Sequence, residues 1–165
     1  MRPNTLSEAA ERIAGGVPAA KALGELLDVF YGAASGEERL AAIRDEPPPT
    51  GDEKLDAVLG AAAEYLAKLY RLSEVPAWAG GPKRRLSKPY FTTTSHSPGM
   101  REYLTFSSPA EFRWRNIFTE ERPLRRARSD QALRAVLADE AVIRAGISGP
   151  RNPSKTPTLP PIMRP

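Results

Sequence analysis

The sequence TGDEKLDAVLGAAAEYLAKLY, residues 50–70, predicts the clearest long helix of the chain. Thr50 and Glu53 have the spacing of a capping box, which starts helices by pairing two side chains with free backbone N–H groups. Behind them, apolar residues recur at helical spacing for about five turns. They form a stripe of Leu55, Val58, Leu59, Ala62, Leu66, Leu69 and Tyr70. The opposite face carries polar residues expected to point mostly outward, namely Asp52, Glu53, Glu64 and Lys68.

Three further helices are predicted before residues 47–49, where consecutive prolines break any helix. The first has Ser7 as its N-cap and ends near Gly15. The second begins at Pro18, a favourable first-turn residue, and its apolar stripe consists of Leu23, Leu26, Leu27, Phe30 and Tyr31. The third starts at the capping-box pair Ser35 and Glu38. The second helix and the helix of residues 50–70 are expected to form the centre of the core.

An irregular segment is predicted for residues 75–99, because four prolines and the pair Gly80-Gly81 prevent any long element. Its large side chains are Trp78, Tyr90 and Phe91. Aromatic residues in such a segment usually pin it onto a helical core. In the alternative interpretation they form an exposed platform for nucleic acid, with basic residues between them.

The remaining helices are predicted to be shorter, and the fold class is an all-α domain of about five or six helices. A short helix is expected over residues 100–106. Ser108 as N-cap, Pro109 at the first turn and Glu111 two residues later predict another, running to about Asn116. A last helix begins at Ser129-Asp130 and ends near Gly146. Residues 1–147 form this domain, and residues 148–165, with six prolines, are expected to be a disordered tail.

Composition fits one cytoplasmic domain. A hydrophobic content of 41% over 165 residues is enough for a core. The chain has no cysteine, which excludes disulfides and thiolate metal sites and fits a reducing compartment. The N-terminus lacks the apolar core of a signal peptide, and no run approaches the roughly 20 apolar residues that a membrane helix needs.

No set of catalytic residues is apparent, so we expect a protein that is not an enzyme and has no cofactor or metal. His96 is the only histidine and lies in a polar stretch of threonines and serines. The alternative of proton transfer at His96 is weak, because a side chain in such a loop is usually solvated. Zinc would need carboxylate ligands. Glycine-rich phosphate loops and the Gly-x-Ser-x-Gly motif are absent from the sequence.

The segment of residues 108–127 interleaves aromatic residues with arginines. Trp and Arg dominate binding hot spots. We therefore predict a partner-binding surface consisting of Arg113, Trp114, Arg115, Asn116 and Phe118. In the alternative interpretation, Phe112, Ile117 and Phe118 belong to the core, and the arginines are solvated or pair with acidic residues of the first half. Residues 1–76 carry 8 Lys and Arg against 13 Asp and Glu, and residues 77–165 carry 16 against 7, and such pairing would also explain this charge split.

The charge of the second half also permits nucleic-acid binding. Residues 83–128 contain 11 basic and 4 acidic residues. The candidate contacts are Lys83, Arg84, Arg85, Lys88, Arg125 and Arg126. No clear helix-turn-helix supports this alternative.

A series of short motifs resembles, in order, a poorly characterised bacterial family that is common in actinobacteria. They are ALGELLDVFY at 22–31, DEPP at 45–48, DAVLGAAAEYLA at 56–67, PAW at 76–78, KPYF at 88–91, SSPAEFRWRNIF at 107–118 and LRRA at 124–127. The chain departs from the family pattern at Tyr90 and Ser107 and in its extension beyond Ala127. Members of this family are often encoded beside nucleotidyltransferase-type proteins. The resemblance therefore implies an antitoxin that binds and neutralises such a toxin.

Overall fold

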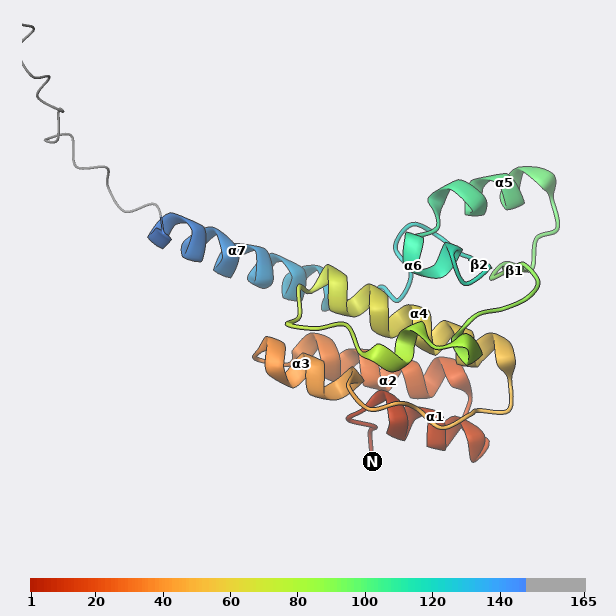
Figure 1. Cartoon of the computed structure of the whole chain (residues 1–165), viewed down its shortest axis with the longest axis horizontal. Coiled ribbons are helices and arrows are strands. Elements are labelled where there is room, and N and C mark those ends of the chain that lie inside the picture. The colour runs from red at the N-terminus through yellow and green to blue at the C-terminus, as the bar shows by residue number, and fades with distance from the viewer. Residues whose placement is uncertain (148–165) are drawn as a thin grey trace, which may run out of the picture.

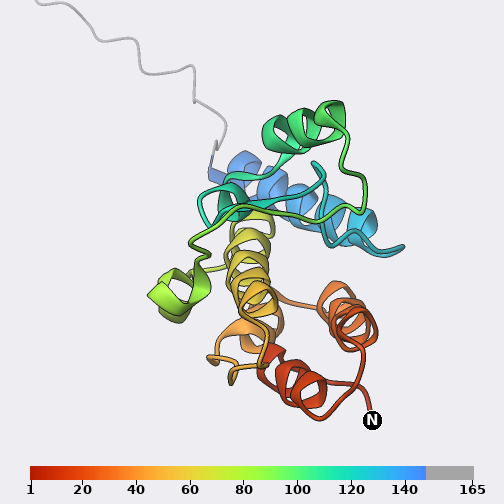
Figure 2. The same cartoon turned by 90° about the vertical axis from the view of Figure 1, so that its right-hand side faces the viewer.

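The helix α4 (Glu53–Leu69) lies at the centre of the fold in the computed structural model, which describes residues 1–147 (Figure 1). Leu59 and Leu66 on one side of α4 belong to a large buried cluster with the N-terminal helices. Ala57 and Ala61 on another side join a second, smaller cluster. In Figure 2 the N-terminal helices (red to orange) and the C-terminal part of the chain (green to blue) lie on different sides of α4. One helix therefore contributes to both cores, the second through Ala57 and Ala61, which lie outside the predicted apolar stripe.

The described residues form seven α-helices, two short 3-10 helices and two short strands, which confirms the all-α class. The N-terminal helices are α1 (Leu6–Ala14), α2 (Ala19–Gly32) and α3 (Gly36–Ile43). Phe30 of α2 is buried against two tyrosines, with ring centroids 5.6 Å from Tyr31 and 5.3 Å from Tyr70, both in edge-on geometry. Such pairs stabilise a core beyond the area that they bury.

Two predicted N-caps are wrong, because a polar residue two positions away takes the cap position. Thr5, not Ser7, caps α1, and its hydroxyl accepts the N–H of Glu8 at 3.1 Å. Asp52, not Thr50, caps α4 and accepts the N–H groups of Lys54 and Leu55. The Thr50 hydroxyl instead donates to the Asp56 carboxylate at 2.7 Å. The predicted cap of α3 is confirmed, since Ser35 accepts the N–H of Glu38.

The irregular segment lies against α4. It holds η1 (Ala77–Gly80), η2 (Pro82–Arg84) and the strand β1 (Tyr90–Phe91). The Trp78 indole donates to the carbonyls of Ile43 and Arg44, at 3.3 and 3.0 Å, so this aromatic residue pins the segment to the core as predicted. Gly60 of α4 permits the close approach of η2, because a Cβ there would lie 2.7 Å from the Cβ of Arg84.

Residues 98–118 form α5 (Pro98–Ser107), α6 (Ala110–Arg113) and β2 (Ile117–Phe118). The helix predicted to run to Asn116 is wrong in length, since α6 is a single turn. Asn116 takes a left-handed φ of 62°, which asparagine tolerates, and the chain then enters β2. β2 pairs in parallel with β1, in the register Tyr90↔Ile117.

Ser108 is also not the cap that its sequence context predicts. Its hydroxyl donates to the Leu104 carbonyl at 2.6 Å and accepts the Thr119 N–H at 2.7 Å. It therefore ties the end of α5 to the segment after β2.

α7 (Ser129–Ile147) begins against the body and then projects from it (Figure 1). Its first turns pack on the large cluster, and Arg71 pairs with Glu140 at 2.7 Å. Two tyrosine hydroxyls hold the start of α7 and the chain before it, because Tyr70 donates to the Ser129 carbonyl and Tyr31 to the Leu124 carbonyl. The predicted tail, residues 148–165, lies outside the described residues. Between residues 1 and 147, the structure contains no helix with the length and apolar character needed to cross a membrane.

Candidate partner-binding groove

A groove of about 520 Å³ lies between the 3-10 segment and the residues that follow α6. It is lined by Gly80, Gly81, Pro82, Arg85, Leu86, Ser87, Trp114 and Asn116. Sequence reasoning placed Trp114 and Asn116 on a partner surface and Arg85 on a nucleic-acid surface. The structure brings the three into one groove, because backbone hydrogen bonds join the two segments. The Leu86 N–H donates to Arg115 at 3.1 Å, and the Tyr90 N–H donates to Asn116 at 2.8 Å.

Trp114 follows the single turn of α6, and 39% of it is exposed. Its indole N–H donates to the Glu64 carboxylate of α4 at 3.2 Å. The guanidinium of Arg115 lies 4.1 Å from the centroid of its ring, within the range of cation–π attraction. An exposed aromatic side chain is thus held in one position by two neighbours.

Arg115 lies in the interior, which differs from the predicted exposed partner contact. It is fully buried, and its guanidinium pairs with Glu64 at 2.6 Å and donates to the Ala79 carbonyl at 2.6 Å. For Arg115 the structure agrees with the alternative interpretation. This arginine pairs with Glu64, an acidic residue of the first half of the chain. Its role is to support the groove from beneath and not to reach a partner.

Glu64 links Trp114 and Arg115. The sequence pattern predicts an outward-facing Glu64, and this prediction is wrong. Its side chain is 15% exposed and accepts from Lys68, Arg115 and Trp114. Burial raises the pKa of Glu64, but the hydrogen bonds from Lys68 and Arg115 outweigh it and hold the pKa below its ordinary value. Burial lowers the pKa of Arg115 and the Glu64 carboxylate opposes that effect. The predicted pair of Glu64 with Lys68 is confirmed at 2.6 Å.

Arg85 is the charged residue that lines the groove. It is exposed, and its guanidinium lies 5.9 Å from the centroid of the Trp114 ring. Within residues 1–147 it forms no salt bridge, in contrast with Arg84 and Arg115, which precede and follow lining residues in the sequence. Its donors are therefore available to a ligand.

The other predicted nucleic-acid contacts are dispersed. Arg84 is 3% exposed and donates to the Pro47 carbonyl at 2.7 Å. Arg125 pairs with Asp130 at 3.0 Å, and Arg126 holds Asp28 through two bonds of 3.0 and 2.8 Å. Lys83 and Lys88 are exposed. Lys83 lines a separate hollow that also contains Glu46 and Asp56.

The remaining predicted partner contacts differ in their accessibility. Asn116 is half-buried, and its amide donates to the Leu86 carbonyl at 2.7 Å. Phe118 is half-buried and stacks on Phe91 with centroids 4.8 Å apart. Arg113 is exposed. Trp114 and Arg113 are thus the accessible members of the set, and the other members fix the local backbone.

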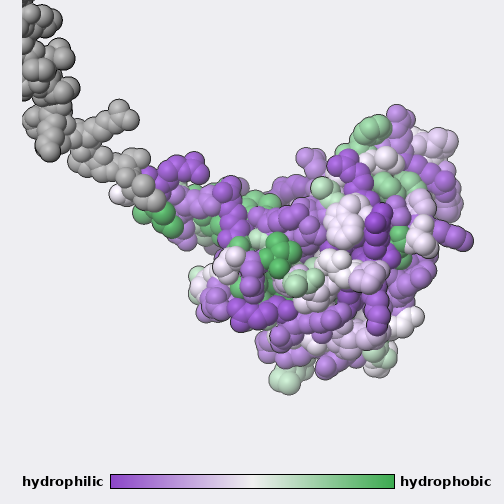
Figure 3. Space-filling model, viewed as in Figure 1, coloured by the Kyte–Doolittle hydropathy of each residue, from purple (hydrophilic) through white to green (hydrophobic). Residues whose placement is uncertain are grey.

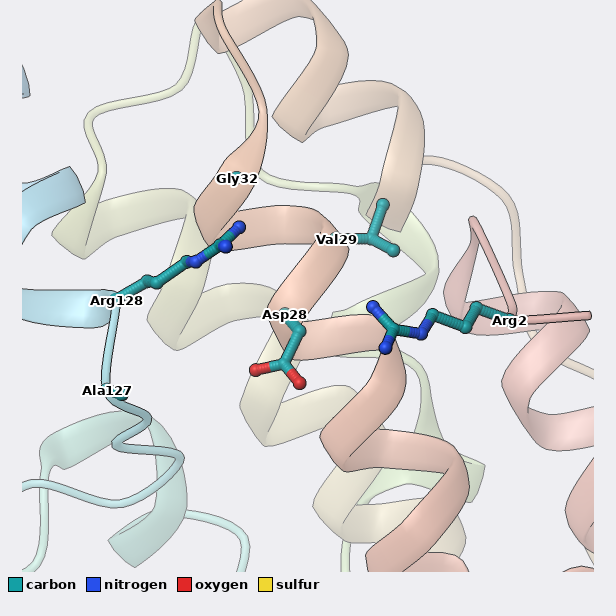
Figure 4. Close-up of a pocket in the computed structure, with 6 residues that line it drawn as sticks. All are labelled: Arg2, Asp28, Val29, Gly32, Ala127 and Arg128. Carbon is teal, nitrogen blue, oxygen red and sulfur yellow. The ribbon is translucent and has the colours of Figure 1, made fainter.

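A second hollow, of about 470 Å³, lies over the end of α2 (Figure 4). Arg2 and Arg128 extend toward this helix from two sides, with Asp28 between them. The Arg126 hydrogen bond is the main cause of the lowered pKa of Asp28, and Arg2 and Arg128 add to it. Cations also compensate the exposed carbonyls at a helix C-terminus. These arginines are therefore explained by the charges of α2 itself.

The described part of the chain contains no group of three His, Asp or Glu side chains placed to hold a metal ion. His96 is exposed in the loop before α5. Sequence reasoning missed Glu64 as the support of the groove and Gly80-Gly81 as its wall. The basic and aromatic composition of residues 83–88 and 113–118 was the signal available for joining the two segments.

Comparison of the chain with protein-family models, curated proteins and solved structures found no match.

Proposed function

We propose that this chain is a non-enzymatic, antitoxin-like protein that binds and neutralises a nucleotidyltransferase-type toxin. The observation that supports a binding role is Trp114, which is 39% exposed yet held by Glu64 and Arg115 beside a groove. Tryptophan is enriched at binding hot spots, and a side chain that is already ordered loses little entropy on association. The kind of partner follows from the resemblance to the antitoxin-like family.

A second observation supports protein binding. The outer side of α5 exposes three large apolar residues, with Phe106 76%, Tyr103 54% and Met100 37% exposed. Figure 3 shows hydrophobic surface over this part of the molecule. Grouped apolar residues on a surface mark sites of protein interaction.

The test is co-expression with the product of the adjacent gene. We expect the two proteins to co-purify and this chain to restore growth that the partner arrests. Trp114→Ala should weaken the complex by about 1–3 kcal/mol, the scale of hot-spot truncations. Melting temperature measured on the same variant separates lost binding from lost folding. An adjacent gene that encodes no nucleotidyltransferase, together with no rescue of growth, would reject the proposal.

A nucleic-acid-binding regulator is the alternative function. Its support is weaker, because Arg84, Arg125 and Arg126 are engaged by carbonyl or carboxylate groups of the fold. A gel-shift titration against the promoter of its own gene tests it. Phosphate contacts predict affinity that falls steeply as salt rises, and an unshifted promoter at low salt would remove this alternative.

A further inference from the structure

We infer that the groove beside Trp114 binds an acidic segment of the partner protein, with a carboxylate held by Arg85 and an apolar side chain against the Trp114 ring. This inference rests on the proposed function and specifies the chemistry of the partner at the same surface.

The charge of the groove comes from a single residue. Arg85 is its sole charged lining residue, and no carboxylate lines it. The neighbouring cations Arg84 and Arg115 are already paired, with Glu46 and Glu64. Arg85 is therefore a charge that the fold leaves uncompensated on the described surface, and a carboxylate would complement it.

The position of the Arg85 guanidinium suits a carboxylate ligand. It lies 5.9 Å from the centroid of the Trp114 ring, within the range of cation–π attraction. A guanidinium in such a place keeps N–H groups along its edge for a carboxylate, which it binds through two parallel bonds. The hydroxyl of Ser87 lines the same groove and adds a polar group beside the charge.

The walls of the groove are held in place by the protein. Glu64 and Arg115 fix Trp114, and the Asn116 amide is bonded to the Leu86 carbonyl. A ligand therefore orders Arg85 and little else, which lowers the entropy that binding costs.

A protein segment fits this groove better than single-stranded nucleic acid. Single-stranded nucleic acid is bound along its backbone by a track of basic residues. Nucleic-acid affinity also needs several phosphate contacts. Arg85 is the one cation that lines the groove, and Lys83 lines a different hollow with two acidic residues.

The experiment uses the full chain and fluorescently labelled probes followed by anisotropy. The probes are an eight-residue peptide of alternating glutamate and leucine, the same peptide with glutamine for glutamate, and a twelve-nucleotide thymidine oligonucleotide. The variants are Arg85→Gln and, as the matched control, Arg134→Gln, which removes an exposed arginine of α7 that does not line the groove. Melting temperatures establish that both variants fold.

We expect the glutamate peptide to bind at least about tenfold more tightly than the glutamine peptide, since a charge-assisted bond is lost. Arg85→Gln should remove that difference, and Arg134→Gln should change it less than about twofold. Equal loss in both variants, or no binding of the glutamate peptide at about 1 mM, overturns the inference. Preferred binding of the oligonucleotide that depends on Arg85 also overturns it.

The same variants separate this inference from the proposed function. A complex with the adjacent gene product that Arg85→Gln leaves unchanged rejects the acidic segment and retains the antitoxin-like role. Absence of that complex, with peptide binding that still requires Arg85, rejects the antitoxin-like role and retains the ligand chemistry of the groove.

Discussion

Arg115 illustrates how one residue can stabilise a surface without being part of it. Its charge is buried and compensated by Glu64, and its guanidinium supports the Trp114 ring. Removing one partner of a buried ion pair leaves the other charge without compensation, which is costly. The residue therefore contributes to binding only through the fold.

We expect Arg115→Leu to lower the free energy of unfolding by about 3 kcal/mol, measured by urea denaturation. The exposed neighbour Arg113 is the control, and Arg113→Ala should change stability by less than about 0.5 kcal/mol. Equal, small effects at both positions would show that the pair with Glu64 contributes little.

The lowered pKa of Glu64 predicts a dependence of stability on pH. Because its pKa is lower in the folded state, the stabilisation is fully present above its ordinary value of 4.5 and is lost as the pH falls through the folded-state pKa. Glu64→Gln should therefore be less stable than the wild type at pH 7, with the difference shrinking below about pH 4. Unfolding free energies of the two proteins across this range measure it, and a difference that stays constant with pH would contradict the prediction.

At the scale of elements, Gly60 decides how closely η2 approaches α4. Alanine favours a helix over glycine by about 1 kcal/mol. A Cβ at residue 60 would lie 2.7 Å from the Cβ of Arg84 and 3.2 Å from the Ala79 carbonyl oxygen. The first atom is the stem of a buried side chain, so the helix and η2 must separate.

We expect Gly60→Ala to destabilise the protein by about 1–3 kcal/mol, because the cost of overpacking exceeds the gain in helix propensity. Thermal unfolding measures the effect. The same substitution at Gly99, where a Cβ meets nothing within 4 Å, is the control. A stabilised Gly60→Ala variant would mean that η2 moves away at no cost.

Elements with strong local signals were predictable, and those set by distant contacts were not. The stripes of α2 and α4 follow from sequence periodicity, and both helices are confirmed. The end of α6 depends on the pairing of β2 with β1, which lies far away in the sequence. In the groove, Trp114 was identified from its residue type, whereas the Arg115–Glu64 pair joins residues 51 positions apart and leaves no local pattern. Neighbouring polar residues such as Thr50 and Asp52 are equally plausible caps until the backbone is known.

At the scale of the whole molecule, the two buried clusters share α4, so we expect their unfolding to be coupled. We expect one cooperative transition in urea, with the same midpoint by tryptophan fluorescence and by far-ultraviolet circular dichroism. Trp114 reports on the segment outside the large cluster, whereas Trp78 packs against that cluster, and the dichroism reports mainly on the helices. A fluorescence midpoint well below that of the dichroism would show that residues 77–119 unfold separately.

The parallel pairing of β1 with β2 has a practical consequence for how the polypeptide can be divided. The loop before α5 is exposed at Thr94, His96 and Ser97, and the chain on either side is anchored by β1 and by α5. Cutting the loop at residue 95 removes one covalent link and leaves the packing on α4 intact. The two fragments, 1–95 and 96–165, should therefore reassemble when co-expressed, which would make this chain a candidate for split-protein complementation.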